Sequence, residues 1–240
     1  MIPLLLKIRL SQFFFISFGS FLGLTYLVHG ITFTPAALTL FSVNSFLYGF
    51  YISHVLGAQK SRIDELSKII RAEANALFDI LIKTKKLPPV SRNYIQDMCE
   101  AYITASFRQH KPAEGEDEYE HLISYCLNYD GKDPKTIEKI LNDLIANQQN
   151  RSQLAMQLGN KVFSNEWWIM LVLFSITMGF ILFLNIQDTL LMHIVKALLC
   201  TGLAMLMINL LKLSTLTHKK AKQIWKPLDT LKTSRFRRFD

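Results

Sequence analysis

Four long apolar stretches interrupt a chain that is otherwise rich in charged residues. They cover residues 10–28, 36–56, 167–184 and 190–211. Each is close to the ~20 residues that an α-helix needs to cross ~30 Å of hydrocarbon. The pattern therefore predicts four transmembrane helices in two hairpins, with a long polar segment between the hairpins.

The Lys and Arg residues indicate on which side of the membrane each connection lies. The two short connections, residues 29–35 and 185–189, contain neither Lys nor Arg. Basic residues lie instead before the first stretch, between the second and third, and after the fourth. Because positive charge is retained on the cytoplasmic side of a membrane, we expect both chain ends and the polar segment to be cytoplasmic.

The apolar positions keep a helical period beyond the second stretch, as far as Pro88 and Pro89. Because a helix does not continue through two prolines, this predicts one helix of about 50 residues that leaves the membrane. Further helices are expected near Ser91, over residues 118–127, and after Asp133, a plausible N-cap that precedes Pro134. No strand-like alternation is present.

The predicted fold class is an all-α membrane protein with four transmembrane helices and a helical cytoplasmic bundle. We expect the second and third transmembrane helices to extend into this bundle. The predicted parts are a first transmembrane hairpin, a cytoplasmic helical region, a second transmembrane hairpin and a basic cytoplasmic tail, at residues 1–57, 58–165, 166–211 and 212–240.

The net charge of +8 is concentrated in the tail, because acidic and basic residues balance in the cytoplasmic region. A basic tail next to a membrane helix is expected to bind anionic lipid headgroups. Its Trp225, and the pair Trp167 and Trp168 at the start of the third stretch, suit the depth of those headgroups. Nucleic acid is not an expected partner, because so short a tail holds no recognition fold.

The sequence offers little for an enzyme or a cofactor. It has no glycine-rich phosphate loop, nucleophile elbow or His-Glu-x-x-His motif. His110, His121 and Cys126 are the only metal-like group in the cytoplasmic region, and their spacing fits no zinc pattern. We expect no catalytic residue, metal or cofactor, and free thiols at Cys99, Cys126 and Cys200.

Polar residues within the apolar stretches are the remaining candidates for a functional site. Lys196 follows His193 by one turn in the fourth stretch. An ionisable residue there is costly and marks a cavity or a partner, so the pair could attract anions near the outer side; alternatively, Lys196 extends to the membrane surface.

One stripe of the second stretch combines aromatic rings with a small polar group. It suits the lining of a narrow pore, although it could equally be a packing face in which the amide of the Asn bonds a neighbouring helix. No Asp or Glu lies in any of the four stretches, which disfavours a carboxylate cation site. The candidate lining residues are Phe41, Asn44, Tyr48 and Tyr51.

Three segments carry a resemblance to a known family. They are Glu73-Ala74-Asn75-Ala76-Leu77 followed by Leu87-Pro88, the helix from Arg92 to Tyr102, and Arg151-x-x-Leu154 leading to Glu166-Trp167-Trp168. Their order resembles the bestrophin family, and the length resembles its bacterial bestrophin-like members. The resemblance implies an ion channel for small anions such as chloride, built from five copies in the bacterial cytoplasmic membrane.

Two departures from bestrophins narrow this expectation. Bestrophins have a neck of bulky apolar residues spaced one turn apart on the second helix, and here Asn44 interrupts the corresponding stripe. The acidic residues that form a calcium-binding clasp in animal bestrophins are not recognisable, so calcium gating is not expected. The alternative is a non-conducting membrane scaffold or sensor whose cytoplasmic bundle binds a partner. A membrane enzyme is a third and weaker alternative.

Overall fold

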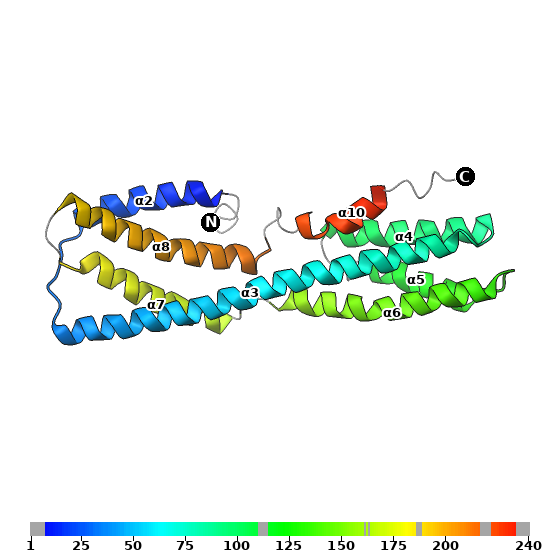
Figure 1. The fold of residues 1–240 in the computed structure, drawn as a ribbon, viewed down its shortest axis with the longest axis horizontal. Helices are drawn as coiled ribbons and strands as arrows, with labels where there is room; N and C mark the ends of the chain where they lie inside the picture. Colours follow the sequence, from blue (N-terminus) through cyan, green and yellow to red (C-terminus); the bar gives the residue numbers. More distant parts are fainter. Residues whose placement is uncertain are drawn as a thin grey trace. The chain divides into compact units, whose positions relative to one another are not determined.

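The computed structural model describes residues 8–109, 115–160, 162, 164–185, 189–216 and 222–233. Within these ranges the chain consists of helices joined by short loops, with an isolated bridge between Ile31 and Leu184. The helices are α2 (Leu10–Leu27), α3 (Pro35–Thr84), α4 (Pro89–Gln109), α5 (Glu116–Leu127), α6 (Pro134–Gly159), α7 (Ser164–Phe183), α8 (Leu190–Ser214) and α10 (Lys226–Thr233) (Figure 1).

Among the described residues, four helices are long and apolar enough to cross a membrane. They are α2, α3, α7 and α8, and they contain the four apolar stretches of the sequence except Val28 and Leu184. The all-helical class and the four candidate spans are thus as expected, whereas their arrangement as two hairpins remains a prediction.

Helix α3 is a single helix of 50 residues, as the sequence predicts. It begins at Pro35, a residue suited to a first turn because its missing N–H would have no helical partner. It ends at Thr84, four residues ahead of the prolines at 88 and 89. No Pro occurs between these ends, so no interior hydrogen bond of the helix is lost.

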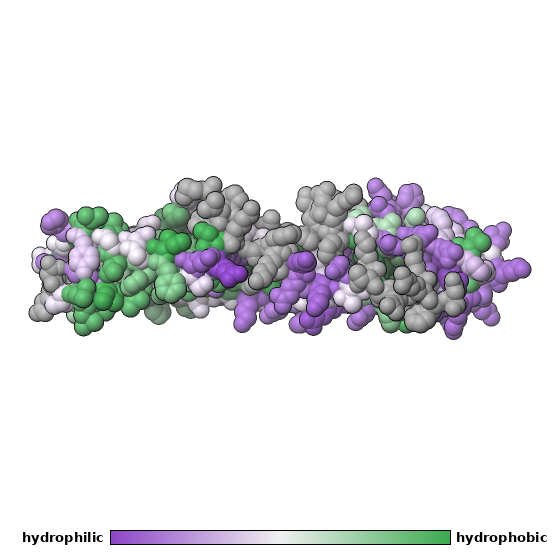
Figure 2. Space-filling model, turned by 90° about the horizontal axis from the view of Figure 1, so that it is seen from above, coloured by the Kyte–Doolittle hydropathy of each residue, from purple (hydrophilic) through white to green (hydrophobic). Residues whose placement is uncertain are grey.

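The chain divides into two compact units, which α3 traverses. Unit 1 comprises Met1–Ser61 and Lys161–Thr217. In it, α8 packs against α2 and α7. A core of Tyr48, Ile52, Val55, Met170 and Leu210 joins α3 to α7 and α8. Figure 2 shows mainly hydrophobic residues on the surface of this unit.

Unit 2 comprises Arg62–Asn160 and His218–Asp240. In it, α4 packs against α5, α5 against α6, and α10 against α4. The surface of this unit is mainly hydrophilic in Figure 2. Its interior is mainly apolar, and burial of each apolar side chain stabilises the fold by about 1.5–3 kcal/mol. The core residues include Leu77, Ile80, Ile95, Leu122 and Ile140.

The predicted extension of the third transmembrane helix into the bundle is not what the structure shows. Helix α6 ends at Gly159, where the N–H of the C-cap Asn160 bonds the carbonyl of Met156. Helix α7 then begins separately at Ser164. Glycine is a poor helix former, and here it marks the end of a helix that apolar periodicity alone would extend.

Trp225 also differs from its predicted place at the lipid headgroups. Its indole is buried in unit 2, together with Ile224 and Leu228. The helix that follows it, α10, packs against α4. A tryptophan buries a large apolar area, so the protein interior provides the apolar surroundings that the sequence analysis assigned to the membrane.

Candidate functional site

One face of α3 in unit 1 forms an open groove. A small residue occurs at every fourth position, which brings these residues to one side of the helix. Phe46 and Phe50 lie beside them, 71% and 67% exposed, with ring centroids 6.3 Å apart. The lining residues are Ser45, Phe46, Gly49, Phe50, Ser53, His54, Gly57, Ala58 and Ser61.

The groove combines three kinds of group that matter for solute passage. The exposed hydroxyls of Ser53 and Ser61 can bond water or an ion, the glycines leave room, and the two phenylalanine rings narrow the path. Among the nine lining residues, His54 alone is ionisable. The face therefore carries no acidic side chain.

The predicted lining stripe lies on a different face of α3. The Asn44 amide donates to Thr177 Oγ1 at 2.8 Å and to the Leu173 carbonyl at 3.2 Å. Tyr48 is only 2% exposed, and its hydroxyl donates to the carbonyl of Leu203 at 3.5 Å. In the described chain these groups contact α7 and α8, which is the packing interpretation that the sequence left open.

The two other predicted lining residues also contact their own unit. The Phe41 ring stacks on Phe180, with centroids 5.2 Å apart. Tyr51 packs against the core that contains Tyr48. Neither residue lines the groove.

Lys196 and His193 belong to α8. Lys196 contacts the end of α7, and His193 contacts α2. The Lys196 side chain is buried, and its ammonium donates to the carbonyl of Leu184, just beyond the last residue of α7. A cation suits this place, because the C-terminal end of a helix carries partial negative charge. The His193 ring stacks on Tyr26, with centroids 4.2 Å apart. Neither residue lines the groove, and attraction of anions remains a prediction for both.

The tryptophan pair at the start of α7 divides between two environments. Trp167 packs against the core of unit 1, whereas Trp168 is exposed. Trp168 is therefore the member of the pair whose indole is available to lipid headgroups. That role remains a prediction.

The metal-like group of the sequence cannot be assembled from the described residues. His110 lies outside them, while His121 is exposed and Cys126 is buried. In the described part of the chain, no three His, Cys, Asp or Glu residues are grouped so that they could hold a metal ion.

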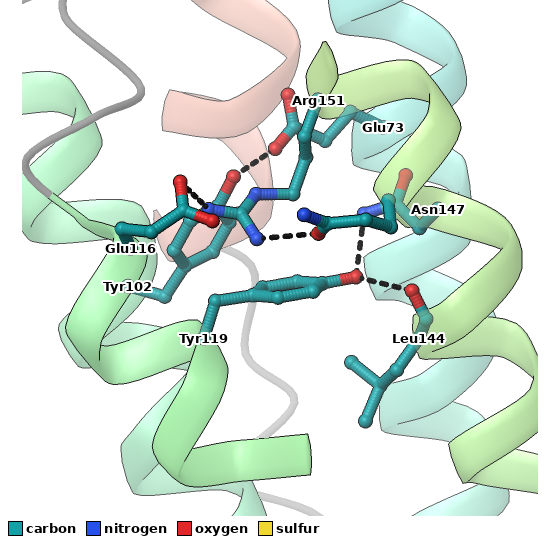
Figure 3. A network of polar contacts seen from close by, with 8 residues as sticks. Glu73, Tyr102, Glu116, Tyr119, Leu144, Asn147 and Arg151 are labelled. Atoms are coloured by element: carbon teal, nitrogen blue, oxygen red, sulfur yellow. Dashed lines mark hydrogen bonds and ion pairs between the residues drawn. The ribbon is translucent and has the colours of Figure 1, made fainter.

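Unit 2 contains a buried polar network to which four helices contribute (Figure 3). Glu73 of α3, Tyr102 of α4 and Arg151 of α6 are all buried. The Tyr102 hydroxyl donates to Glu73 Oε1. Arg151 donates from one terminal nitrogen to Glu116 Oε2 of α5 and from the other to Gln148 Oε1, both at 2.8 Å.

Two aromatic rings flank the Arg151 guanidinium. Its central carbon lies 3.8 Å from the ring centroid of Tyr119 and 5.1 Å from that of Tyr102. The Tyr119 hydroxyl is itself fixed, because it donates to the Leu144 carbonyl at 2.8 Å and accepts from the Asn147 amide at 3.2 Å. Cation–π contacts of this kind strengthen when the cation is removed from water.

The electrostatics of the network favour a neutral Glu73. Glu73 lies in unit 2, outside the apolar stretch of residues 36–56. Burial raises the pKa of its carboxyl group, opposed by the hydrogen bond from Tyr102 and the charge of Arg151. Among the described residues, neither Glu73 Oε2 nor Arg151 Nε has a hydrogen-bond partner. A buried charge with incomplete hydrogen bonding is costly.

Sequence reasoning did not single out this network. Three of its buried members come from the three segments that carry the resemblance, at Glu73, Tyr102 and Arg151. A local signal was present at Glu73, a charged residue on the face of α3 that otherwise holds Ile70, Ala74 and Leu77. The sequence does not show which residues contact Glu73, because Tyr102 and Arg151 lie on helices that are far away along the chain.

The fold and these sites define an all-helical protein with candidate membrane spans. The family model described as Bestrophin-like domain matches residues 31–216, which cover most of the chain. The chain therefore belongs to this family, as its resemblance implies. No curated protein and no solved structure matches the chain.

Proposed function

We propose that the protein is an ion channel assembled from several copies, in which the groove of α3 lines the path of small anions such as chloride. Membership of the bestrophin-like family suggests a channel-related role. The observation that carries the proposal is the groove itself, an exposed face of a candidate transmembrane helix that is lined by small, hydroxyl and aromatic residues.

The contacts of α3 favour this face over the one predicted from the sequence. Asn44 and Tyr48 are already bonded to α7 and α8 of the same chain. Phe46 and Phe50 have no such role and stay exposed. In a cyclic oligomer, one copy of α3 from each chain would bring two rings of phenylalanine to the axis, where apolar constrictions can gate by dewetting.

Charge supports an anion as the permeating ion. The four apolar stretches contain no Asp or Glu, and the groove has His54 as its ionisable side chain. We further propose a bacterial cytoplasmic membrane location with both chain ends inside, five copies per channel as in bestrophins, and contact of the basic tail with anionic lipids.

The test is chloride flux into liposomes that contain the full chain. Phe46→Ala and Phe50→Ala should widen the constriction and raise the flux several-fold. Phe15→Ala is the matched control, because Phe15 of α2 is 71% exposed, as is Phe46, but lies outside the groove. Absence of flux from folded wild-type protein would exclude the channel. Equal effects of Phe15→Ala and Phe46→Ala would exclude the assignment of the groove as the lining of the pore.

A non-conducting scaffold or sensor is the second candidate. It is favoured by apolar side chains on unit 2 that are exposed, among them Val90, Tyr94 and Leu127. The Tyr94 ring contacts that of Tyr125, with centroids 4.3 Å apart, which adds aromatic surface suited to protein contact. A folded monomer in lipid discs, without chloride flux, would favour this candidate.

A further inference from the structure

Arg151 lies between two carboxylates that differ in exposure. The Arg151 side chain is 3% exposed, whereas that of its partner Glu116 is 43% exposed. Glu73 is buried on α3 and acts electrostatically on the same guanidinium, although no hydrogen bond between the two is present. Figure 3 shows both carboxylates near the guanidinium.

The charges of the network balance in one protonation state only. With Glu116 ionised, the Arg151–Glu116 pair is neutral, and an ionised Glu73 would add a second negative charge. Arg151 is the cation that acts on Glu73 among the described residues. The other titratable groups that face the network are Tyr102 and Cys99 from α4 and Tyr119 from α5, and burial raises the pKa of each. These groups therefore stay neutral.

The two unpartnered atoms indicate a second arrangement. Glu73 Oε2 can accept a hydrogen bond and Arg151 Nε can donate one, and neither has a partner among the described residues. A guanidinium that shifts between its two flanking rings would keep its aromatic contacts while it exchanges one carboxylate for the other. Charge-assisted bonds between Arg and a carboxylate are strong enough to bias such a choice.

We propose that Arg151 alternates between two carboxylates: it holds Glu116 while Glu73 carries a proton, and it pairs with Glu73 once that proton is released to solvent. No other bond forms or breaks, and the network loses one proton. This inference does not depend on ion conduction.

The exchange would act on the start of α5. Glu116, Asp117 and Glu118 form its first turn, and the N-cap Gly115 makes no side-chain cap hydrogen bond. The pair with Arg151 is therefore an anchor of this turn to α6. When Arg151 turns to Glu73, the first turn of α5 opens more often, and the bundle responds to cytoplasmic pH through a two-state element.

Hydrogen exchange of the full chain in lipid discs tests this directly. The readout is the protection factor of the amides at the start of α5, which removes the intrinsic effect of pH on exchange. Protection should fall about tenfold between acidic and alkaline pH in the wild type, the order expected for loss of one charge-assisted contact. In Glu73→Gln, which imitates the protonated acid, protection should stay high at every pH.

Two further variants complete the test. Glu138→Gln is the matched control, because Glu138 is an exposed residue of α6, and it should behave as the wild type. In Glu116→Gln, Arg151 has Glu73 as its remaining carboxylate, so protection should be low and independent of pH. If Glu73→Gln fails to fold, Glu116→Gln carries the test. The proposal is overturned if wild-type protection is constant with pH, or if the fall persists in either variant.

Discussion

At the residue scale, Glu73 shows how burial can decide a protonation state. A carboxyl group taken out of water prefers its neutral form unless paired charges compensate. Here the nearest cation, Arg151, bonds Glu116 and Gln148 instead. Burial raises the pKa of Glu73, while the hydrogen bond from Tyr102 and the charge of Arg151 oppose that rise.

The stability of unit 2 should therefore fall as pH rises. With a raised folded pKa, the folded state holds the Glu73 proton at pH values where the unfolded chain, with an ordinary pKa of about 4.3, has lost it. The stabilisation is fully present below pH ~4.3 and is lost as pH rises through the folded pKa. Thermal unfolding followed by circular dichroism should show this loss in the wild type and a flatter profile in Glu73→Gln. Identical profiles would contradict the assignment.

Position 54 is where a substituted charge should set ion preference. His54 is exposed and lines the groove of α3. A fixed positive charge there should raise chloride flux several-fold in His54→Lys, and a negative charge in His54→Glu should suppress chloride and admit cations. The corresponding changes at His121, which is exposed in unit 2, should alter neither. The measurement is the reversal potential of reconstituted protein in a chloride gradient.

At the element scale, the sequence predicts the bounds of α3 but not which of its faces is buried. Its start, length and end follow from periodicity and from prolines, and the structure agrees. Which stripe faces inward does not follow, because Asn44 and Tyr48 on one face and Phe46 and Phe50 on another both repeat with helical spacing. Packing against α7 and α8 selects the first stripe as interior, and only the folded chain supplies that contact.

Two other features required tertiary contacts for the same reason. The sequence shows that Ile224, Trp225 and Leu228 are apolar, but not whether protein or lipid covers them. The buried network likewise joins Glu73, Tyr102 and Arg151 from three helices. Nothing in the spacing of these residues along the chain predicts their contact.

Trp225 should contribute strongly to the docking of α10. Because its indole is buried beside Leu228, Trp225→Ala should leave a cavity and destabilise unit 2 by about 3–5 kcal/mol. Lys226→Ala, at an exposed neighbour, should have little effect. Hydrogen exchange of residues 222–233 and chemical unfolding would measure both changes. An unaltered Trp225→Ala protein would place the indole outside the core.

At the scale of the whole molecule, the chain combines two surfaces of opposite character. Unit 1 presents mainly hydrophobic residues and unit 2 mainly hydrophilic ones (Figure 2). The four candidate spans account for the apolar surface, because lipid can cover it without any protein partner. The groove of α3 is the exception, since serine, glycine and histidine give it a more polar lining than lipid requires.

Assembly of several copies around α3 makes a geometric prediction. In a cyclic oligomer with the groove at the axis, equivalent groove positions of neighbouring chains approach one another. Cysteine introduced at Ser53, in the groove, should therefore cross-link between copies on oxidation in membranes. Cysteine at Ser175, an exposed position of α7, should cross-link far less. The native cysteines are buried, and their replacement by serine would remove background.

Equal cross-linking at the two positions would mean that α3 does not face the axis, even if the protein conducts. Because each thiol forms a single disulfide, this cross-link yields covalent dimers only, so the number of copies is counted separately from the mass of the oligomer in lipid discs, where five copies would agree with a pentamer and two would exclude a ring.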